Sequence, residues 1–525
     1  MARRSDRRQF LKTGAGLLVA AGTLGTPGRG VTSPGSQRMR GNPFTLGVAS
    51  GDPLPDAVVI WTRLAPEPLA PGGGMPLRPL LVRWEVAEDE GFRRITRHGW
   101  VAARPELAHA VHVDVEGLAP ARTYWYRFRA AGQWSPTGRT RTAPPADLLW
   151  PRLRYAFASC QDYEDGLYTA WGHLAAEELD LVVFLGDYIY EGAPSAADDK
   201  VRRHAGQGET VSLDAYRQRY AQYKADPALQ AAHAACPWVV TLDDHEVDND
   251  WSGDIPQDPA LQSRDAFRYR RAAAFQAYYE HMPLRLSARP LGPHMRLYRR
   301  LRFGALAEFH VLDTRQHRSV TEPCGYGTGP ACPAIEDPRR TMLGLHQEAW
   351  LYRGLTRSRA RWNVLAQQVP IMRLDVGGTE PAYKLDKWDA YPAARQRLLR
   401  LLASRQPANP LVITGDLHDA WVGLLPRVVD DPDAGVLASE FVATSISSDG
   451  DGAEASEEGI RAFANGRNPH LRFHHYRRGY TYCELTPERC LMQFRAVDYV
   501  SRPGAPLRTV ASYVLEDGDP VARPA

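Results

Sequence analysis

The sequence predicts a mixed α/β protein with two domains, an N-terminal β-sandwich and a larger layered domain with mixed sheets. The chain has 525 residues, more than a single hydrophobic core usually organises. Residues 42–145 alternate apolar and polar positions between Pro- and Gly-rich turns, as half-buried strands do. Residues 150–520 alternate short apolar strands with helical stretches, which is the pattern of a layered α/β domain.

The first 31 residues carry an export pattern. Arg7-Arg8-Gln9-Phe10-Leu11-Lys12 precedes a weakly apolar stretch over residues 13–24 and then a Gly/Pro/Ser-rich segment. This order is typical of a twin-arginine signal, so we expect export by the twin-arginine machinery to a secreted, periplasmic or cell-envelope location. The apolar run is interrupted by Gly and Thr and is too short to span a bilayer, which argues against a stable membrane anchor. A basic disordered tail is the alternative, and the cleavage point stays open.

The N-terminal domain reads as all-β. Its expected strands cover residues 57–63, 81–86, 109–115 and 123–129. The stretch from Leu118 to Tyr126 resembles the tyrosine-corner entry of an immunoglobulin-like or fibronectin-like sandwich. Residues 141–146 predict a linker. The domain has no cluster of titratable residues at ligand spacing, so we expect it to have a structural or substrate-shielding role.

The second domain is expected to combine two sheets. Apolar strands are expected at residues 153–159, 179–185, 237–242, 305–312, 362–367 and 410–414, and helices at 165–178, 213–235, 264–280, 344–358 and 391–405. The later strands 441–444, 479–485, 490–497 and 510–515 are short and joined by turn residues, which favours antiparallel pairing. A core of mixed sheets follows.

Charge and cysteine content narrow the functional classes. The formal charge is +3, but residues 1–31 hold six Arg/Lys and one Asp (+5), so the remainder is +3 − 5 = −2. That balance gives no reason to expect specific nucleic-acid binding. In an oxidising compartment the close pairs Cys324/Cys332 and Cys483/Cys490 are candidate disulfides. Cys160 and Cys236 have no close partner, although they could pair with each other.

Metal-type side chains follow the ends of successive predicted strands, where open α/β sheets place their ligands. Each residue alone could be a turn acid, a core aromatic or a hydrogen-bonded strand end. Together the acids would repel one another strongly in a pocket unless cations neutralised them. The side chains are Cys160 after the first strand, Asp187 and Tyr190 after the second, Asp243, Asp244, His245, Glu246 and Asn249 after the third, and Asp416 and His418 after a later one.

These motifs resemble the alkaline phosphatase D family and, more distantly, the purple acid phosphatases and metallophosphoesterases. Gly186-Asp187-Tyr188-Ile189-Tyr190 matches the Gly-Asp-x-x-Tyr motif of that superfamily, and Cys160 stands where its first acid would be. Asp243-Asp244-His245-Glu246 replaces Gly-Asn-His-Glu, and Gly415-Asp416-Leu417-His418 replaces Gly-His-x-His. These departures are the ones that alkaline phosphatase D proteins show. The resemblance implies a metallophosphoesterase-type αββα sandwich after the N-terminal domain.

The resemblance also implies one Fe³⁺ ion with Ca²⁺ nearby, and the ligand types agree. Phenolate and thiolate suit trivalent iron, and surplus carboxylates suit calcium. The iron is expected to bind Cys160, Tyr190 and His418, with Asp187 as the bridge. Asp244 and Asp416 are expected at the second metal. Asp243 and Asn249 are weaker candidates, because hydrogen bonds within their loop could account for them.

The expected function is an exported, metal-dependent phosphoesterase that hydrolyses phosphomonoesters, phosphodiesters or both by a metal-activated water. His245 is expected to protonate the leaving oxygen or hold a phosphate oxygen, unless it is a core or supporting histidine. Arg315 is expected to clamp a phosphate, or else to form a structural Asp–Arg pair. The Gly-rich segment 447–452 resembles a phosphate loop only superficially.

Two alternatives to this function remain. The first is a phospholipase D-like phosphodiesterase on the same site. The second is a non-enzymatic, calcium-stabilised binding protein whose β-rich domain recognises a surface glycan. The oligomeric state is left open.

Overall fold

The computed structural model describes residues 41–320, 324–325, 327–429, 431–452 and 457–525, without the side chains of residues 457 and 458. The described residues form one compact unit. The predicted signal segment, residues 1–31, lies outside the described residues. Within the described ranges, every helix is too short or too polar to cross a membrane.

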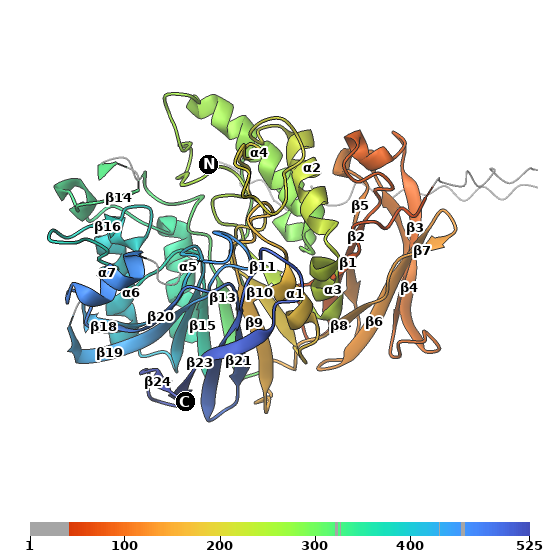
Figure 1. Cartoon of the computed structure of the whole chain (residues 1–525). Coiled ribbons are helices and arrows are strands. Elements are labelled where there is room, and N and C mark those ends of the chain that lie inside the picture. Colours follow the sequence, from red (N-terminus) through yellow and green to blue (C-terminus); the bar gives the residue numbers. More distant parts are fainter. Residues whose placement is uncertain (1–40, 321–323, 326, 430, 453–456) are drawn as a thin grey trace, which may run out of the picture. The chain divides into compact units, whose positions relative to one another are not determined.

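The described strands build a mixed α/β fold with several sheets (Figure 1). In spatial order the ten-stranded sheet contains β24 (Arg523–Pro524), β23 (Leu507–Glu516), β22 (Arg489–Val497), β21 (Gly479–Leu485), β9 (Leu153–Ala158), β10 (Leu181–Phe184), β11 (Trp238–Val240), β1 (Val48–Gly51), β2 (Ala57–Arg63) and β5 (Ala110–Glu116). The seven-stranded sheet contains β12 (Arg299–Phe303), β13 (Ala307–Val311), β15 (Trp362–Ala366), β17 (Pro410–Thr414), β19 (Asp431–Val442), β18 (Ala420–Val428) and β20 (Leu471–His475).

Two smaller sheets complete the described strands. The five-stranded sheet contains β4 (Ile95–Ala103), β3 (Leu80–Ala87), β6 (Thr123–Ala130), β7 (Gln133–Trp134) and β8 (Gly138–Arg141). A two-stranded ribbon joins β14 (Thr328–Gly329) and β16 (Tyr383–Lys384).

Both large sheets have a parallel centre, which brings the ends of successive strands to one edge. In the first sheet β9, β10 and β11 pair in parallel. In the second, β13, β15, β17 and β19 do so. Strands β21, β22 and β23 extend the first sheet antiparallel, as their short spacing predicted.

The segment 441–444 corrects one expectation. It was expected to be antiparallel, and residues 441–442 at the end of β19 do pair antiparallel with β18, but on their other side they pair in parallel with β17, with Phe441 opposite Ile413. The antiparallel partner of β19 is β18, its hairpin neighbour. Because the hairpin reverses the chain before β19 begins, β19 enters the sheet in the same direction as β17.

The helices are α1 (Thr169–Ala175), α2 (Leu213–Lys224), α3 (Pro227–Ala235), α4 (Arg264–His281), α5 (Gly344–Arg357), α6 (Pro392–Arg405) and α7 (Glu457–Ala464). The single helix expected over residues 213–235 is two helices. Pro227 starts α3, and the Asp226 carboxylate accepts hydrogen bonds from the backbone amides of Ala228 (2.9 Å) and Leu229 (3.2 Å). A proline in a helix interior would break the ladder, so the chain restarts there with a capped first turn.

Apolar side chains pack the sheets and helices against one another in layers. Alternate residues of β9, such as Tyr155 and Phe157, pack against β13 and β15 of the other sheet. The intervening residues, Ala156 and Ala158, pack against helices α1 to α4. On the far side of the second sheet, α5 and α6 cover β15 and β17. The two sheets therefore face each other, with helices on their outer faces.

The N-terminal strands form two facing layers around their own core. Val58 and Ile60 of β2 pack against Val82, Tyr126 and Phe128 of the five-stranded sheet. One of these layers is continuous with the large sheet, because β1 pairs in parallel with β11 at Gly51 and Trp238. The β-rich segment and the layered segment therefore share a sheet.

One of the two candidate disulfides is present. Cys324 and Cys332 form a disulfide. Cys483 and Cys490 are free, with sulfur atoms 3.7 Å apart. Their backbone partners are Met492 and Leu485 respectively, so they lie diagonally across the β21–β22 pair and not directly opposite. Cys160 and Cys236 are also free and buried.

Candidate metal centre

The candidate residues lie in tight turns at the ends of parallel strands. Cys160 follows β9, Asp187 follows β10, and Asp416 and His418 follow β17. All four have left-handed backbones, with φ values of 56°, 57°, 68° and 64°. Non-glycine residues adopt that region only where the surroundings enforce it, and such strain gathers at functional sites.

Hydrogen bonds between neighbouring turns hold this geometry. The Cys160 amide donates to the carbonyl of Gly186 (3.1 Å), which ties the β9 turn to the β10 turn. The buried Glu246 carboxylate accepts from the amides of Asp187 (3.2 Å), Tyr188 (2.7 Å) and Asp243 (2.7 Å). Glu246 therefore joins the β10 and β11 turns and contributes no free ligand oxygen.

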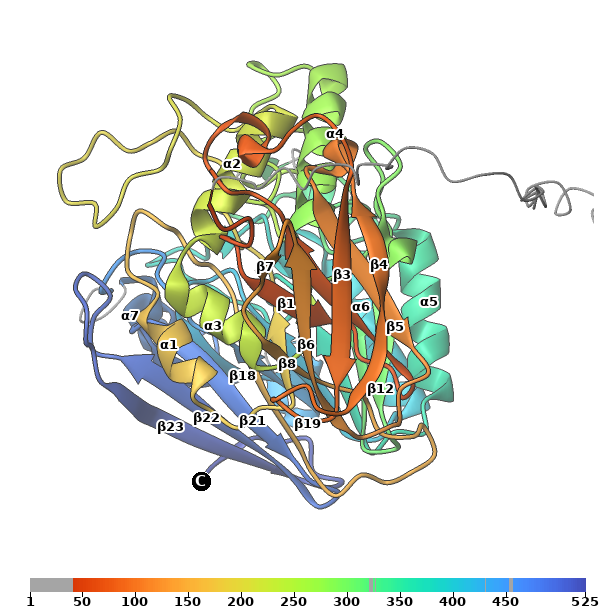
Figure 2. The same cartoon turned by 90° about the vertical axis from the view of Figure 1, so that its right-hand side faces the viewer.

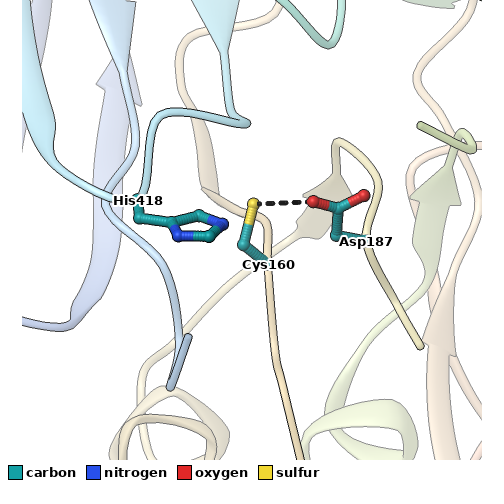
Figure 3. Close-up of side chains that lie close together, drawn as sticks. All are labelled: Cys160, Asp187 and His418. Atoms are coloured by element: carbon teal, nitrogen blue, oxygen red, sulfur yellow. Dashed lines mark hydrogen bonds between the residues drawn. The ribbon is translucent and has the colours of Figure 1, made fainter. Parts of the chain in front are cut away.

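The first group of donors contains Cys160, Asp187, His418 and Tyr190. Figure 3 shows the first three pointing toward one another, with the Cys160 sulfur 3.4 Å from Asp187 Oδ2. One ligand atom of each lies within 4.8 Å of the others. The Tyr190 hydroxyl donates to Asp187 Oδ2 (3.3 Å) and lies 3.1 Å from His418 Nε2. The four predicted iron ligands thus converge.

The second group consists of carboxylates that follow β11 and β17. Asp243, Asp244 and Asp416 bring carboxylate oxygens within 4.8 Å of one another, and Asp187, Asp244 and His245 form an overlapping group. Asp187 is common to the first group and to this overlapping one. A bridging carboxylate needs this position, since its two oxygens serve neighbouring ions.

The donor set fits the expected ions. Burial raises the pKa of the Cys160 thiol, the Tyr190 phenol and the Asp187 carboxyl well above their ordinary values, and nearby carboxylates add to the rise. A bound cation would reverse this by stabilising the anionic forms. Asp243 Oδ2 is buried and has no hydrogen-bond partner among the described residues. It is therefore available to a cation.

Two protein cations share the acidic cluster. The guanidinium of Arg315, whose side chain is fully buried, pairs with Asp243, Asp244 (3.3 Å), Asp386 (2.6 Å) and Asp416 (3.0 Å). The Lys387 ammonium reaches both Asp416 oxygens, at 2.6 and 2.5 Å. The prediction that bound metal must neutralise these acids is therefore incomplete, since Arg315 and Lys387 supply part of the charge. These ion pairs agree with the alternative expected for Arg315, a structural pairing with aspartate.

His245 lies beside both groups. Its ring stacks on Tyr190, with centroids 4.1 Å apart, and its Nδ1 lies 2.7 Å from Glu191 Oε2. Burial lowers the pKa of His245, but the carboxylates of Glu191, Asp187 and Asp244 outweigh that effect and hold the pKa well above its ordinary value. These carboxylates therefore favour the protonated form of the His245 ring. Glu191 also accepts from the amide of Asn249 (2.8 Å), so hydrogen bonds do hold this loop.

Sequence reasoning missed several supporting residues. The Asp449 carboxylate lies 2.7 Å from His418 Nδ1. The Ser448 hydroxyl donates a hydrogen bond to the Tyr190 hydroxyl (2.8 Å). Asp449 and Ser448 lie in the 447–452 segment, which therefore supports the candidate ligands. Its local sequence contains no metal motif, so only the fold could find it. Lys387 likewise had no sequence signal, whereas Glu191 directly follows Tyr190.

The chain is similar to known proteins along most of its length. Residues 155–494 match the PhoD-like phosphatase family, and residues 30–144 match the N-terminal domain of PhoD-like phosphatases. Alkaline phosphatase D of Bacillus subtilis (strain 168) is 46% identical over 518 residues, which cover 97% of this chain and 88% of that protein. A solved structure described as the structure of PhoD superposes with a TM-score of 0.89 at 46% identity and covers 93% of each chain.

Proposed function

We propose that one Fe³⁺ ion and neighbouring Ca²⁺ serve the reaction of this chain. The premise is that the chain belongs to the PhoD-like phosphatase family and is a phosphoric ester hydrolase. Family membership sets aside the non-enzymatic binding protein considered above. The observation that carries the proposal is the position of Asp187, which belongs both to the thiol–imidazole group and to the group of Asp244 and His245. The proposed substrates are phosphomonoesters, phosphodiesters or both.

In this proposal Cys160, Tyr190 and His418 would hold the iron, Asp244 and Asp416 would hold a second ion, and Asp187 would serve as the bridge between them. Asp243 and Asn249 are the additional candidates. Such cations supply Lewis-acid activation of water and charge stabilisation of the phosphate oxygens. Asp449 supports the assignment of His418, because its contact with Nδ1 leaves Nε2 directed at Tyr190.

The chain's own groups would position the ester and move the proton. Glu191 engages Nδ1 of His245, so Nε2 is the nitrogen that can donate to the leaving oxygen. The raised pKa of His245 favours the protonated ring that can donate this proton. Arg315 fixes the carboxylates that surround the second ion, so we propose that it positions them and does not itself clamp the phosphate.

We also propose the finer assignments of fold and location. The facing mixed sheets with outer helices support a metallophosphoesterase-type αββα sandwich over residues 150–520. The facing layers of residues 42–145 support an immunoglobulin-like or fibronectin-like N-terminal domain. The twin-arginine pattern supports export through the twin-arginine machinery to a secreted, periplasmic or cell-envelope location.

The test combines metal analysis, a visible spectrum and ester hydrolysis on the exported protein. We expect iron and calcium, and a tyrosinate-to-iron absorption band that Tyr190→Phe removes. Tyr188→Phe is the matched control, because its hydroxyl contacts His233 at 2.7 Å and not the Asp187 carboxylate. Cys160→Ala and Asp187→Asn should lower the iron content.

Hydrolysis of p-nitrophenyl phosphate and bis(p-nitrophenyl) phosphate then separates monoester from diester preference. Cleavage of the diester alone would favour the phosphodiesterase alternative, including its phospholipase D-like form. Zinc alone, or a colourless protein without metal, would contradict the ligand assignment. Failure of the iron- and calcium-loaded protein to cleave either ester would contradict the proposed reaction.

A further inference from the structure

The outer face of the five-stranded sheet carries a continuous line of tryptophan and arginine. Arg83 on β3 lies directly opposite Trp100 on β4 and Arg129 on β6, and Arg129 lies opposite Trp134 on β7. Directly opposed residues of antiparallel strands point to the same face. Trp100, Arg83, Arg129 and Trp134 therefore form one transverse row, here termed the Trp–Arg row.

This face points away from the core. The alternate residues Val82, Tyr126 and Phe128 fill the core between the sheets, so the row is on the opposite side. In Figure 2, strands β3, β4 and β6 face the viewer with no helix in front of them. Neighbouring strands lie about 4.8 Å apart, so the backbones at Trp100 and Trp134 stand roughly 14 Å apart along the row.

Both tryptophans are accessible to a ligand. Trp100 is 64% exposed and Trp134 is 37% exposed, and they are the only tryptophans of the described residues exposed to this degree. Leu81, on the same face, is 66% exposed. Large apolar side chains gathered on one face commonly mark a binding surface, whereas single exposed ones need no explanation.

The row is held in place before any ligand arrives. The Arg127 guanidinium lies 3.9 Å from the ring centroid of Phe92 and 4.0 Å from that of Trp134. Arg127 is fixed in turn by Glu85 (2.8 Å), and Arg129 lies 5.3 Å from the Trp134 centroid. These contacts stabilise one orientation of the indole, which reduces the entropy that binding must overcome.

The face carries a surplus of positive charge. Glu85 pairs with Arg83 (2.7 Å) and Arg127 (2.8 Å), so one carboxylate serves two guanidiniums. Arg129 is exposed and forms no ion pair with the described residues. Guanidiniums flanked by indoles suit a ligand with acidic groups and weakly polar C–H faces. The acidic groups accept hydrogen bonds from arginine, and the C–H faces pack on the negative face of the indole.

We propose that the Trp–Arg row binds an anionic glycan, with sugar rings on Trp100 and Trp134 and acidic groups on Arg83 and Arg129. The chain after residue 31 carries a net charge of about −2, so the positive charge of this face is a local feature and not part of a basic chain. Duplex nucleic acid, which needs a broad basic field, fits less well. The row lies on a different sheet from the metal centre, so glycan binding and ester hydrolysis should be separable.

The test uses polymers that a phosphoesterase does not cleave. Dextran sulfate supplies sugar and anion, dextran supplies the sugar alone, and poly(vinyl sulfate) supplies the anion alone. Affinity electrophoresis and calorimetry should show binding to dextran sulfate that is at least tenfold tighter than binding to the other two. Phosphatase activity and melting temperature of each variant report that it is folded.

Variants then assign the binding to the row. Trp100→Ala with Trp134→Ala should weaken dextran sulfate binding tenfold or more, while Trp100→Tyr with Trp134→Tyr should retain most of it. Arg83→Gln with Arg129→Gln should weaken binding and reduce its salt dependence. Arg264→Gln with Arg268→Gln removes the same charge from an exposed part of α4 and should leave binding unchanged.

The proposal would be overturned by three results. Equal binding of poly(vinyl sulfate) or of duplex DNA would reduce the face to a nonspecific basic patch. Equal loss in the α4 variant would show that total charge decides the affinity. No binding of dextran sulfate by the wild-type protein would remove the site.

Discussion

At the scale of single residues, Arg315 shows how one buried side chain organises the acidic cluster. Its guanidinium contacts carboxylates that follow β11 and β17 and a third that precedes η6 (Trp388–Ala390). Removing one partner from a buried ion-pair network leaves the others uncompensated, which typically destabilises by about 3–5 kcal/mol. Arg315 therefore has a structural role whatever ions the site binds.

Arg315→Met should destabilise the protein by about 3–5 kcal/mol in urea unfolding. Arg315→Lys should recover only part of this, because an ammonium lacks the planar fork that reaches several carboxylates. If Arg315 instead serves as a phosphate clamp, Arg315→Lys would raise KM and leave the unfolding free energy unchanged, contrary to our expectation.

Lys224, the last residue of α2, is buried and has no acidic partner among the residues that the structure describes. Its ammonium lies 4.4 Å from the Trp61 ring centroid, 5.3 Å from that of Tyr188 and 3.4 Å from His233 Nε2. Desolvation lowers its pKa from 10.5 to about 7. Between these values the unfolded chain binds a proton that the folded chain lacks, so the contribution of Lys224 to stability improves as pH rises.

Lys224→Met should therefore stabilise the protein at pH 7 and below, by up to about 5 kcal/mol. The gain should shrink through pH 7 to 10 and disappear above about pH 10.5, where both states are neutral. Urea midpoints of both proteins across this pH range measure the difference. A gain that is independent of pH would show that Lys224 is charged and satisfied in the folded protein.

At the scale of elements, the turns after the parallel strands pack so closely that glycine is required between them. Gly186 has φ 118°, and a Cβ there would lie 2.4 Å from Asp243 Cβ and 2.6 Å from its amide. Gly415 is similarly confined by the Ser159 side chain, with a Cβ contact of 2.5 Å. Glycine thus allows the turns of β10 and β11, and of β17 and β9, to bring their side chains together.

Gly186→Ala should move the Asp187 and Asp243 turns apart and lower kcat/KM by 100-fold or more, as small displacements of catalytic groups do. Gly192→Ala is the control, because no atom lies within 4 Å of its added Cβ. Iron content should fall with activity in the first variant only. Full activity in Gly186→Ala would show that the turns can separate without disturbing the site.

At the scale of the whole molecule, the N-terminal strands complete the large sheet. Beyond the β1–β11 pairing, the Trp61 indole donates to the carbonyl of Glu280 (3.0 Å), and Asp52 pairs with Arg299 (2.7 Å). These contacts join residues that are more than 200 positions apart. The layered segment without its N-terminal strands would expose the β11 edge, which favours aggregation.

A fragment of residues 150–525 should therefore be insoluble or should unfold at a much lower temperature than the whole chain. Co-expression with residues 42–149 should restore solubility and ester hydrolysis if the two pieces pair through β1 and β11. Expression trials and thermal unfolding measure both. A soluble, fully active fragment would show that the N-terminal strands are dispensable.

The sequence by itself identified the α/β class, the candidate ligands and the strands that precede them, whereas strands such as β1, β4, β12, β18 and β20 were not predicted. This was possible because periodicity is local and because parallel strand ends converge whatever their order in the sheet. Cys160, Asp187, Tyr190 and His418 could thus be grouped before any contact was known. The family followed from the same motifs.

Only the tertiary structure decided which distant groups meet. The direction of β19, the sharing of a sheet by β1 and β11, and the placement of Lys387 and Asp449 depend on pairings between segments far apart in the chain. The Trp–Arg row depends on strand register, since a shift of one residue would send its side chains to the other face. Alternation within a strand shows which of its residues share a face, but it does not show which distant strand lies opposite, so these features became visible only in the folded chain.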